Sequence, residues 1–311
     1  MNDLQTKKDF DVIICGGGAA GLSAALWCDD LGLDALLLEV RDELGGQLLR
    51  VYNPIKNHLG SSAENGRELR DIFLKQITER KFTLVLEAEI KEIDLTEKTF
   101  TLTSGERFAG KSVVIATGVS RRRLKVPGET EFKDRGIFES GMRDRNLIIG
   151  KTAAIVGGGD AALENTLILA ETAAKVWLIH RRRELTARPE FVERVSAHPK
   201  IETLTETIVE KIIGSERVES IEVKNIKTGE TRRLPINALL IRIGVVPNTE
   251  LFRGKADLDD EDYIKIDSLC ATNIKDVFAV GDVANPLAPT VSGAVGMGAT
   301  AVKAIFAALN L

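Results

Sequence analysis

Residues 11–21, DVIICGGGAAG, decide the fold of this 311-residue chain. The apolar run 11–15 predicts a short buried strand, and residues 22–31 have helical spacing. Residues 34–39, DALLLE, predict a second strand. Strand, glycine turn, helix and strand in this order are typical of a βαβ unit that binds a dinucleotide.

Each glycine of the Gly16-x-Gly18-x-x-Gly21 pattern has its own task. The first permits the sharp turn, the second lets the backbone approach a pyrophosphate, and the third lets the helix pack close to the strand. The helix N-terminus offers N–H groups and a partial positive charge to phosphates. Glu39 ends the second strand, where an acid accepts hydrogen bonds from a ribose. A lone pattern of this kind is weak, but the ordered strand, helix and acid favour a nucleotide site over a simple glycine-rich turn.

The same order of elements returns in the middle of the chain. Residues 152–156 predict a strand, 157–162 (GGGDAA) a second glycine turn, and the following residues a helix to about Thr172 and a strand at 175–179. Two such units predict an α/β protein with two Rossmann-like, three-layer ββα domains. We expect the chain to cross between them after Gly118 and around 244–248. Residues 1–118 with 245–311 would then form an FAD-binding domain, and 119–244 an inserted NAD(P)H-binding domain.

Further strands are predicted from the apolar pattern. They lie within 83–93 and at 99–103, 112–116, 207–213, 217–224 and 238–243, and residues 292–311 predict a final helix.

Composition and charge narrow the class of partner. The net charge of −4 argues against nucleic acid or a membrane surface as the main partner, and no apolar run is expected to span a bilayer. The N-terminal sequence MNDLQTKKDF lacks an apolar signal region, so a cytoplasmic protein is expected. Widely spaced cysteines and histidines predict neither a disulfide framework nor a metal site. These residues are Cys15, Cys28, Cys270, His58, His180 and His198.

Three further segments indicate which dinucleotide the first unit binds. Residues 116–118 (ATG) end one apolar strand, 272–282 (TNIKDVFAVGD) end another, and 45–47 (GGQ) follow the first unit. They resemble the motifs of flavoprotein reductases with two dinucleotide domains, in which an ATG turn and a TxxxxVFAxGD strand complete the FAD site. The resemblance implies FAD, with Asp282 at its ribityl-phosphate part.

The second unit has a different nucleotide signature. Its turn ends with Ala162 where the first ends with glycine, as in NADPH-binding helices that pack slightly further from their strand. The next strand is followed by HRRR at 180–183 and by Arg188, with no acid. An acid would bind the 2′-hydroxyl of NADH, whereas guanidinium groups pair with the 2′-phosphate of NADPH. NADPH is therefore favoured, the alternative being a solvated basic run.

The segments GGGAAG, GGQL, ATG, GGGDAALEN, HRRR, IGVVPNT and VFAVGD occur in the order and at the spacings of the low-molecular-weight thioredoxin reductases. The chain resembles that family over essentially its whole length. The resemblance implies an FAD domain made of both chain ends, an inserted NADPH domain, a homodimer, and a hinge that lets NADPH and the acceptor take turns at the flavin.

The chain departs from this family at the redox-active CxxCD segment. The matching residues 135–144 are RGIFESGMRD, so Ser140 and Arg143 stand at the cysteine positions. Serine is not oxidised by flavin and arginine is no nucleophile, so the disulfide relay to thioredoxin is not expected. The three cysteines elsewhere are expected to be structural. One group of reductases for small disulfides carries a cysteine at the position of Ala20, which argues against that activity.

Two other departures concern the cofactors. The family pattern HRRxxxRA puts an arginine at position 186, where this chain has Thr186, and Arg183 and Arg188 are candidates to compensate. Where the family usually has Arg-Gln-Ala against the flavin, this chain has PTV at 289–291, whose backbone N–H groups at Thr290 and Val291 remain available. Asn57 matches a flavin-contacting asparagine of the family.

The sequence therefore predicts an FAD-dependent oxidoreductase that passes electrons between NADPH and a non-dithiol acceptor such as ferredoxin. It is similar to the thioredoxin-reductase-like ferredoxin–NADP reductases, although these also carry a C-terminal extension over the flavin. Basic clusters at 121–125 and 143–145 would steer an acidic ferredoxin, or are ordinary surface charge. The alternatives are a flavoprotein that acts on a small disulfide, a quinone or oxygen without NADPH, and a non-catalytic FAD-binding redox sensor.

The predicted site residues are all cofactor-binding, because the flavin carries the chemistry and no catalytic side chain is assigned. For FAD they are Gly16, Gly18, Ala20, Gly21, Glu39, Gly46, Gln47, Asn57, Ala116, Thr117, Gly118, Gly281, Asp282, Thr290 and Val291. For NADPH they are Gly157, Gly159, Asp160, Glu164, His180, Arg181, Arg182 and Arg188.

Overall fold

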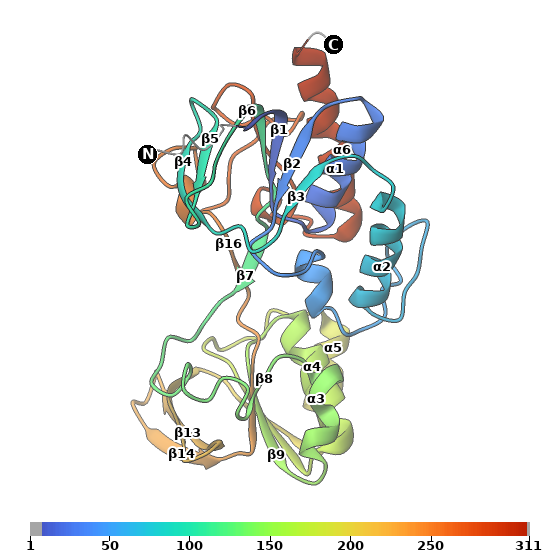
Figure 1. Ribbon diagram of the computed structural model, residues 1–311. Helices are drawn as coiled ribbons and strands as arrows, with labels where there is room; N and C mark the ends of the chain where they lie inside the picture. The colour runs from blue at the N-terminus through green and yellow to red at the C-terminus, as the bar shows by residue number, and fades with distance from the viewer. Residues whose placement is uncertain (1–7, 310–311) are drawn as a thin grey trace. The chain divides into compact units, whose positions relative to one another are not determined.

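The computed structural model describes residues 8–309 and divides into two compact units (Figure 1). Unit 1 takes Met1–Ser120 and Val246–Leu311, and unit 2 is Arg121–Val245. Residues 1–7, most of the stretch from which no signal region is predicted, lie outside the described residues. The chain passes between the units twice, and strands β7 (Val119–Arg121) and β16 (Val245–Pro247) pair at these crossings.

Unit 1 is built on a seven-stranded sheet of order β3-β2-β1-β6-β5-β4. Strand β6 is long enough for β5 to pair antiparallel with its first half, while β17 pairs parallel with its second half. The neighbours β3, β2, β1 and β6 are parallel, so their carboxyl ends share one edge. The strands are β1 (Lys8–Cys15), β2 (Ala35–Leu38), β3 (Thr83–Val85), β4 (Ile90–Asp94), β5 (Thr99–Leu102), β6 (Arg107–Ile115) and β17 (Val277–Ala279).

The core of unit 1 lies on both faces of this sheet. Side chains alternate along β1, so Val12 and Ile14 face helices α1 (Ala19–Asp30) and α6 (Val291–Ala308), whereas Ile13 packs with Phe100 on the other face. Burial on both faces explains why the central strands are almost continuously apolar. Helix α2 (Gly66–Ile77) and the short helices η1 (Gly46–Arg50), η3 (Glu250–Phe252) and η4 (Gly281–Val283) complete the unit.

Helix α6 corrects one expectation. By length and composition it could cross a membrane, although the sequence was expected to hold no such run. The face of α6 that carries Gly298 packs on α1: a Cβ at Gly298 would lie 2.5 Å from the Ala20 carbonyl oxygen, and the Ser23 hydroxyl donates to the Val295 carbonyl (2.7 Å). Ala301, Val302 and Ile305 are buried in the same core, so α6 packs one of its faces into unit 1.

Unit 2 has the predicted three layers. A parallel sheet of order β11-β10-β9-β15-β8 carries helices on one face and the antiparallel sheet β12-β13-β14 on the other. The fold prediction, α/β with two Rossmann-like domains, is confirmed. The strands are β8 (Ile137–Phe138), β9 (Thr152–Val156), β10 (Lys175–Ile179), β11 (Ile201–Leu204), β12 (Thr207–Gly214), β13 (Val218–Asn225), β14 (Thr231–Pro235) and β15 (Ala238–Ile241). The helices are α3 (Gly141–Asp144), η2 (Arg145–Ile148), α4 (Asp160–Thr172) and α5 (Pro189–Ser196).

Candidate functional site

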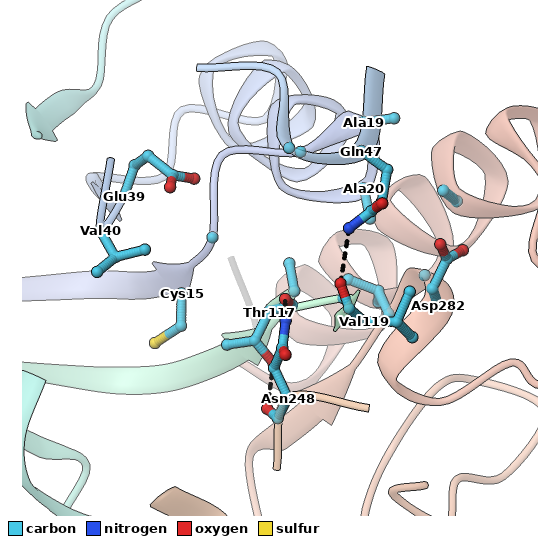
Figure 2. Close-up of a pocket in the computed structure, with 18 of the residues that line it drawn as sticks. Cys15, Ala19, Ala20, Glu39, Val40, Gln47, Thr117, Val119, Asn248 and Asp282 are labelled. Carbon is cyan, nitrogen blue, oxygen red and sulfur yellow. Dashed lines mark hydrogen bonds between the residues drawn. The ribbon is translucent and has the colours of Figure 1, made fainter. Parts of the chain in front are cut away.

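A cavity of about 620 Å³ lies within unit 1, along the carboxyl ends of β2, β1, β6 and β17 (Figure 2). This is the edge at which open parallel sheets bind ligands, and the volume is typical of a cofactor pocket. Of the residues predicted for FAD, all but Gly21 and Asn57 line it. Those that do are Gly16, Gly18, Ala20, Glu39, Gly46, Gln47, Ala116, Thr117, Gly118, Gly281, Asp282, Thr290 and Val291.

Two glycines on the cavity wall, Gly16 in the glycine turn and Gly46 beyond it, leave no space for a side chain. A Cβ at Gly16, whose φ is +111°, would lie 2.4 Å from the Ala116 carbonyl oxygen, and one at Gly46 would lie 2.8 Å from the Cα of Gly18. Gly21 has a different part: its Cβ would lie 1.9 Å from the Gly16 carbonyl oxygen, so it lets α1 pack against the turn. No side chain caps the N-terminus of α1, and its first N–H groups are available to an anion.

Glu39 anchors one end of the cavity. Its carboxylate is 5% exposed and accepts hydrogen bonds from the N–H of Gly17 to Oε2 (2.7 Å) and of Arg41 to Oε1 (3.0 Å). A carboxylate has about four acceptor positions, so each oxygen can also accept from a hydroxyl group. The acid is therefore held in place and is able to bind a ribose.

A pair of amide side chains holds the ATG turn. The Gln47 amide donates to the Val119 carbonyl (2.6 Å), and the Asn248 amide donates to the Thr117 carbonyl (2.7 Å) (Figure 2). The Thr117 hydroxyl donates in turn to the Asn248 carbonyl (2.9 Å). Asn248 lies in the IGVVPNT segment, yet it was not among the predicted site residues, although it lines the cavity.

The far end of the cavity is formed by Asp282 and the start of α6. Burial raises the pKa of the Asp282 carboxyl above its ordinary value. Gly281 has a φ of +72°, and a Cβ there would lie 2.9 Å from the Ala20 side chain. The Thr290 hydroxyl accepts from the Gly293 N–H (3.1 Å) and so caps α6.

The structure does not bring Asn57 to this cavity. Asn57 is exposed in the loop 56–62. The neighbouring His58 instead reaches α6, with Nδ1 3.1 Å from the Ser292 hydroxyl, and its ring packs on Phe73.

Apolar residues that line the cavity were also not predicted, because a strand end that faces a ligand has the same composition as one that faces the core. They include Leu38, Val40, Ala88, Ile90 and Leu251.

The second glycine turn, in unit 2, is equally tight. A Cβ at Gly157 would lie 2.1 Å from the Arg242 carbonyl oxygen, and one at Gly158 would lie 2.3 Å from the His180 ring. His180 is buried, its Nε2 lies 3.0 Å from the Glu184 carbonyl oxygen, and burial lowers its pKa. Because its ring packs directly on the turn, His180 supports the turn from below.

The basic residues after β10 are not all alike. Arg181 and Arg182 are exposed, whereas Arg188 donates from its backbone N–H and its Nε to the Asp160 carboxylate (2.8 Å each). These bonds from Arg188, the backbone one first, lower the pKa of Asp160. Arg188 is thereby tied to the first turn of α4, which begins directly after Gly159 and carries the half-buried Glu164. At position 186, the Thr186 hydroxyl donates to the Gly158 carbonyl (3.2 Å).

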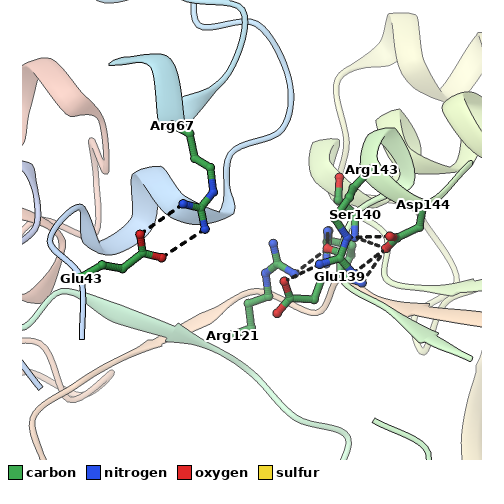
Figure 3. A network of polar contacts seen from close by, with 8 residues as sticks. Glu43, Arg67, Arg121, Glu139, Ser140, Arg143 and Asp144 are labelled. Atoms are coloured by element: carbon green, nitrogen blue, oxygen red, sulfur yellow. Dashed lines mark hydrogen bonds and ion pairs between the residues drawn. The ribbon is translucent and has the colours of Figure 1, made fainter. Parts of the chain in front are cut away.

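An arginine–carboxylate network occupies the position of the family's dithiol (Figure 3). The buried Asp144 carboxylate accepts from the N–H groups of Glu139 (3.1 Å) and Ser140 (3.2 Å). The Arg143 guanidinium binds both oxygens of Asp144 (2.6 and 2.9 Å) and also reaches the Glu139 carboxylate (3.2 Å). Ser140 is 6% exposed at the start of α3.

The three cysteines lie in unit 1 and are buried. Burial raises the pKa of Cys15 and of Cys28 to about 12, and that of Cys270 to about 11. Such thiols stay protonated at neutral pH, and only the thiolate is a nucleophile. Within residues 8–309, no group of three or more His, Cys, Asp or Glu side chains is placed to hold a metal ion.

Comparison with known proteins gives a consistent result. Residues 10–298 match the family model described as pyridine nucleotide-disulphide oxidoreductase. A thioredoxin reductase of Treponema pallidum (strain Nichols) is 35% identical over 279 residues, which cover 89% of this chain and 90% of that protein. The 34.2 kDa protein in the rubredoxin operon of Clostridium pasteurianum is 29% identical over 96% of each chain. The crystal structure of Lactococcus lactis thioredoxin reductase (FR conformation) superposes with a TM-score of 0.84 at 29% identity, over 97% of this chain and all of that one.

Proposed function

We propose that this chain, a member of the pyridine nucleotide-disulphide oxidoreductase family, passes electrons from NADPH to an acceptor other than a dithiol. It is an FAD- and NADPH-dependent oxidoreductase of thioredoxin reductase fold. The acceptor we favour is a small electron carrier such as ferredoxin. The observation that carries this proposal is the replacement of the dithiol by Ser140 and Arg143, with Arg143 bound to Asp144.

The cavity of unit 1 is the proposed FAD site. It offers a fixed acid for a ribose at Glu39, uncapped N–H groups of α1 for the pyrophosphate, and wall glycines whose side chains would fill the cradle. Asp282 and the backbone at Thr290 and Val291 border the other end. Bound FAD supplies hydride acceptance from the nicotinamide and electron transfer to the acceptor, and the chain positions it.

NADPH is proposed to bind at the second glycine turn. The first turn of α4 would take the pyrophosphate, and the exposed Arg181 and Arg182 would take the 2′-phosphate. Arg188 is already paired with Asp160, so its proposed part is to hold the start of α4 and to present its remaining N–H groups. Residue 186 would make no ionic contact, since it is a threonine.

The cysteines support a non-dithiol acceptor. No thiol lies in the described part of unit 2, and all three cysteines of the chain are buried in unit 1 with a raised pKa. A disulfide relay needs two thiols that can approach one another and one that ionises.

Exposed basic residues and one relative favour a small electron carrier as the acceptor. Arg122, Arg123 and Lys125 are exposed and could attract an acidic carrier, whereas Arg121 and Arg143 face the Glu139 network. The surface charge is thus smaller than the sequence cluster suggests. The relative named for the rubredoxin operon is compatible with such a carrier. We further propose a homodimer located in the cytoplasm.

Anaerobic mixing with NADPH, and separately with NADH, tests the proposal through bleaching of the flavin absorption. We expect fast bleaching by NADPH, slowed in an Arg181→Gln/Arg182→Gln variant but not in Arg217→Gln, an exposed control on the same unit. The bleached enzyme should then be reoxidised by ferredoxin and not by oxidised thioredoxin. No bleaching by either nucleotide, or reoxidation by thioredoxin, would contradict the proposal.

A further inference from the structure

An acid stands at the start of helix α4, directly after the second glycine turn. Residues 157–159 of this turn are three glycines, as are residues 16–18 of the first turn, but Asp160 then takes the position of Ala19. Asp160 is the first residue of α4, and no side chain caps the N-terminus of this helix. The turn in unit 2 is therefore followed by a carboxylate, where the turn in unit 1 is followed by a methyl group.

Arg188 binds both oxygens of this carboxylate. Its backbone N–H donates to Oδ1 of Asp160 and its Nε donates to Oδ2, at 2.8 Å each. Because these bonds lower the pKa of Asp160, the backbone bond first, the acid is charged at neutral pH. Nη1 of the same guanidinium lies 3.3 Å from the Glu190 carboxylate, and its Cζ lies 4.8 Å from the centre of the Phe191 ring. Arg188 is thus a single cation that faces two acids.

The segment before Arg188 is bound to the glycine turn as well. Thr186 donates from its N–H and from its hydroxyl to the Gly158 carbonyl (2.8 and 3.2 Å). After Arg188 the chain enters α5, which lies beside α4 in unit 2 (Figure 1). The two bonds of Thr186 and the backbone bond of Arg188 do not involve the guanidinium group. Removing the charge of Arg188 therefore leaves this loop bound to the turn and to the start of α4.

The charges around Arg188 decide which part of a nucleotide it can serve. Asp160 and Glu190 together carry two negative charges against one positive charge, so this group does not attract a further anion such as a 2′-phosphate. Arg181 and Arg182 differ, since they are exposed and form no ion pair within residues 8–309. A carboxylate without its arginine would instead repel a pyrophosphate at the start of α4, because both anions compete for the positive end of the helix.

We propose that Arg188 is a positioning residue of the nucleotide site: it holds and neutralises Asp160, so that the pyrophosphate of NADPH can bind at the start of α4. It does not select between NADPH and NADH, a choice that belongs to Arg181 and Arg182. This inference rests on the proposed binding of NADPH at the second glycine turn. Loss of the guanidinium group therefore weakens both nucleotides equally, and loss of the Asp160 charge restores them.

Calorimetric titration of the FAD-loaded enzyme with NADP⁺, and separately with NAD⁺, tests this role without turnover. We expect Arg188→Gln to weaken both nucleotides by the same factor, about tenfold, because both carry the pyrophosphate. The double variant Asp160→Asn/Arg188→Gln keeps an acceptor for the N–H of residue 188 and should bind both nucleotides within about threefold of the wild type. A loss of structure alone would not be restored by removing a second charge. Arg194→Gln, an exposed arginine of α5, is the matched control and should change neither affinity.

Three results overturn the inference. They are a loss in Arg188→Gln that is confined to NADP⁺, unchanged binding of both nucleotides by that variant, and a double variant that binds no better than Arg188→Gln. Should Arg188→Gln fail to fold, as judged by melting temperature and FAD content, Asp160→Asn alone carries the test: it should weaken neither nucleotide, and a loss of affinity would make Asp160 itself a ligand.

The proposed function is tested separately by Arg181→Gln/Arg182→Gln, which should lower the affinity for NADP⁺ and leave that for NAD⁺ unchanged. If this variant changes neither affinity while the Arg188 series behaves as expected, the proposed place of the 2′-phosphate is wrong and the role of Arg188 stands. If the wild type binds neither nucleotide, the proposed site and the role of Arg188 are both wrong.

Discussion

Replacing Glu39 by glutamine changes one atom of the side chain but removes one of a defined pair of hydrogen bonds. The N–H groups of Gly17 and Arg41 donate to different oxygens of the carboxylate, at 2.7 and 3.0 Å. Whichever way the glutamine amide lies, one of these donors faces an NH₂ group. The loss of one hydrogen bond to a charged group costs about 1.5–3 kcal/mol. For a domain of this size that corresponds to a fall in melting temperature of about 3–10 °C.

The same change should weaken FAD binding. A ribose hydroxyl that donates to the carboxylate loses a charged acceptor, so we expect the Kd for FAD to rise by about 10- to 100-fold. Fluorescence titration of the FAD-free protein measures the Kd, and thermal unfolding without FAD measures stability separately. Glu89→Gln is the matched control, because Glu89 lines the same cavity but is exposed. If Glu39→Gln leaves both quantities at the values of this control, the placement of Glu39 in the site is refuted.

Three further experiments test the same unit. Gly46→Ala places a Cβ 2.8 Å from the Cα of Gly18 and should abolish FAD retention, measured by absorbance. Gly32→Ala, at a φ of +70° against +52° for Gly46, has open space around its Cβ and should retain FAD after a similar loss of about 1–2 kcal/mol. Asp282→Asn should raise the melting temperature of the FAD-free protein at pH 7. Burial raises the pKa of Asp282 in the folded state, so its contribution to folding stability is fully present below the ordinary pKa of 3.8 and is lost as the pH rises through the folded-state pKa. At pH 7 the wild type has lost this contribution, whereas asparagine carries no charge to bury. An equal melting temperature for the two proteins at pH 7 would contradict this. The three cysteines should resist iodoacetamide in the native protein and react only on unfolding, and rapid native labelling would argue against their burial.

Sequence patterns predicted those strands and helices that are marked by nearby residues. Strand β9 ends at Val156 as predicted, because the glycine turn that follows fixes this boundary, and helix α4 ends at Thr172 as predicted. Helix α2 was not predicted, although its start carries a local capping pattern: the Asn65 side chain accepts from the Glu68 N–H. Strand β14 escaped for another reason: its TRRLP sequence is largely polar, and only its pairing with β13 makes it a strand.

In the candidate site, too, local patterns predicted some residues and missed those that depend on distant partners. Glycine spacing and the acid at the strand end predicted residues that line one cavity, the proposed FAD site, because contacts with phosphates and sugar require particular residue types. Asn248 and Arg242 act through partners 131 and 103 residues away, Thr117 and Glu139, and no local pattern reveals such pairs. Asn57 is the opposite case: it matches a family motif, but it does not line the cavity, because a motif match does not determine how the surrounding loop folds.

The residues at the dithiol positions belong to a network of ion pairs and hydrogen bonds. Arg143 supplies two of the four hydrogen bonds to the buried Asp144, so restoring a cysteine there would leave that carboxylate with two backbone donors. It would also remove one positive charge from the cluster and the Arg143 contact to the Glu139 carboxylate. The segment is thus held together by ion pairs and hydrogen bonds. In the proposed function, electrons would leave from the proposed FAD site in unit 1, because no thiol lies in the described part of unit 2. The proposed acceptor would then have to reach that cavity, which favours a carrier that receives electrons without forming a bond to the protein.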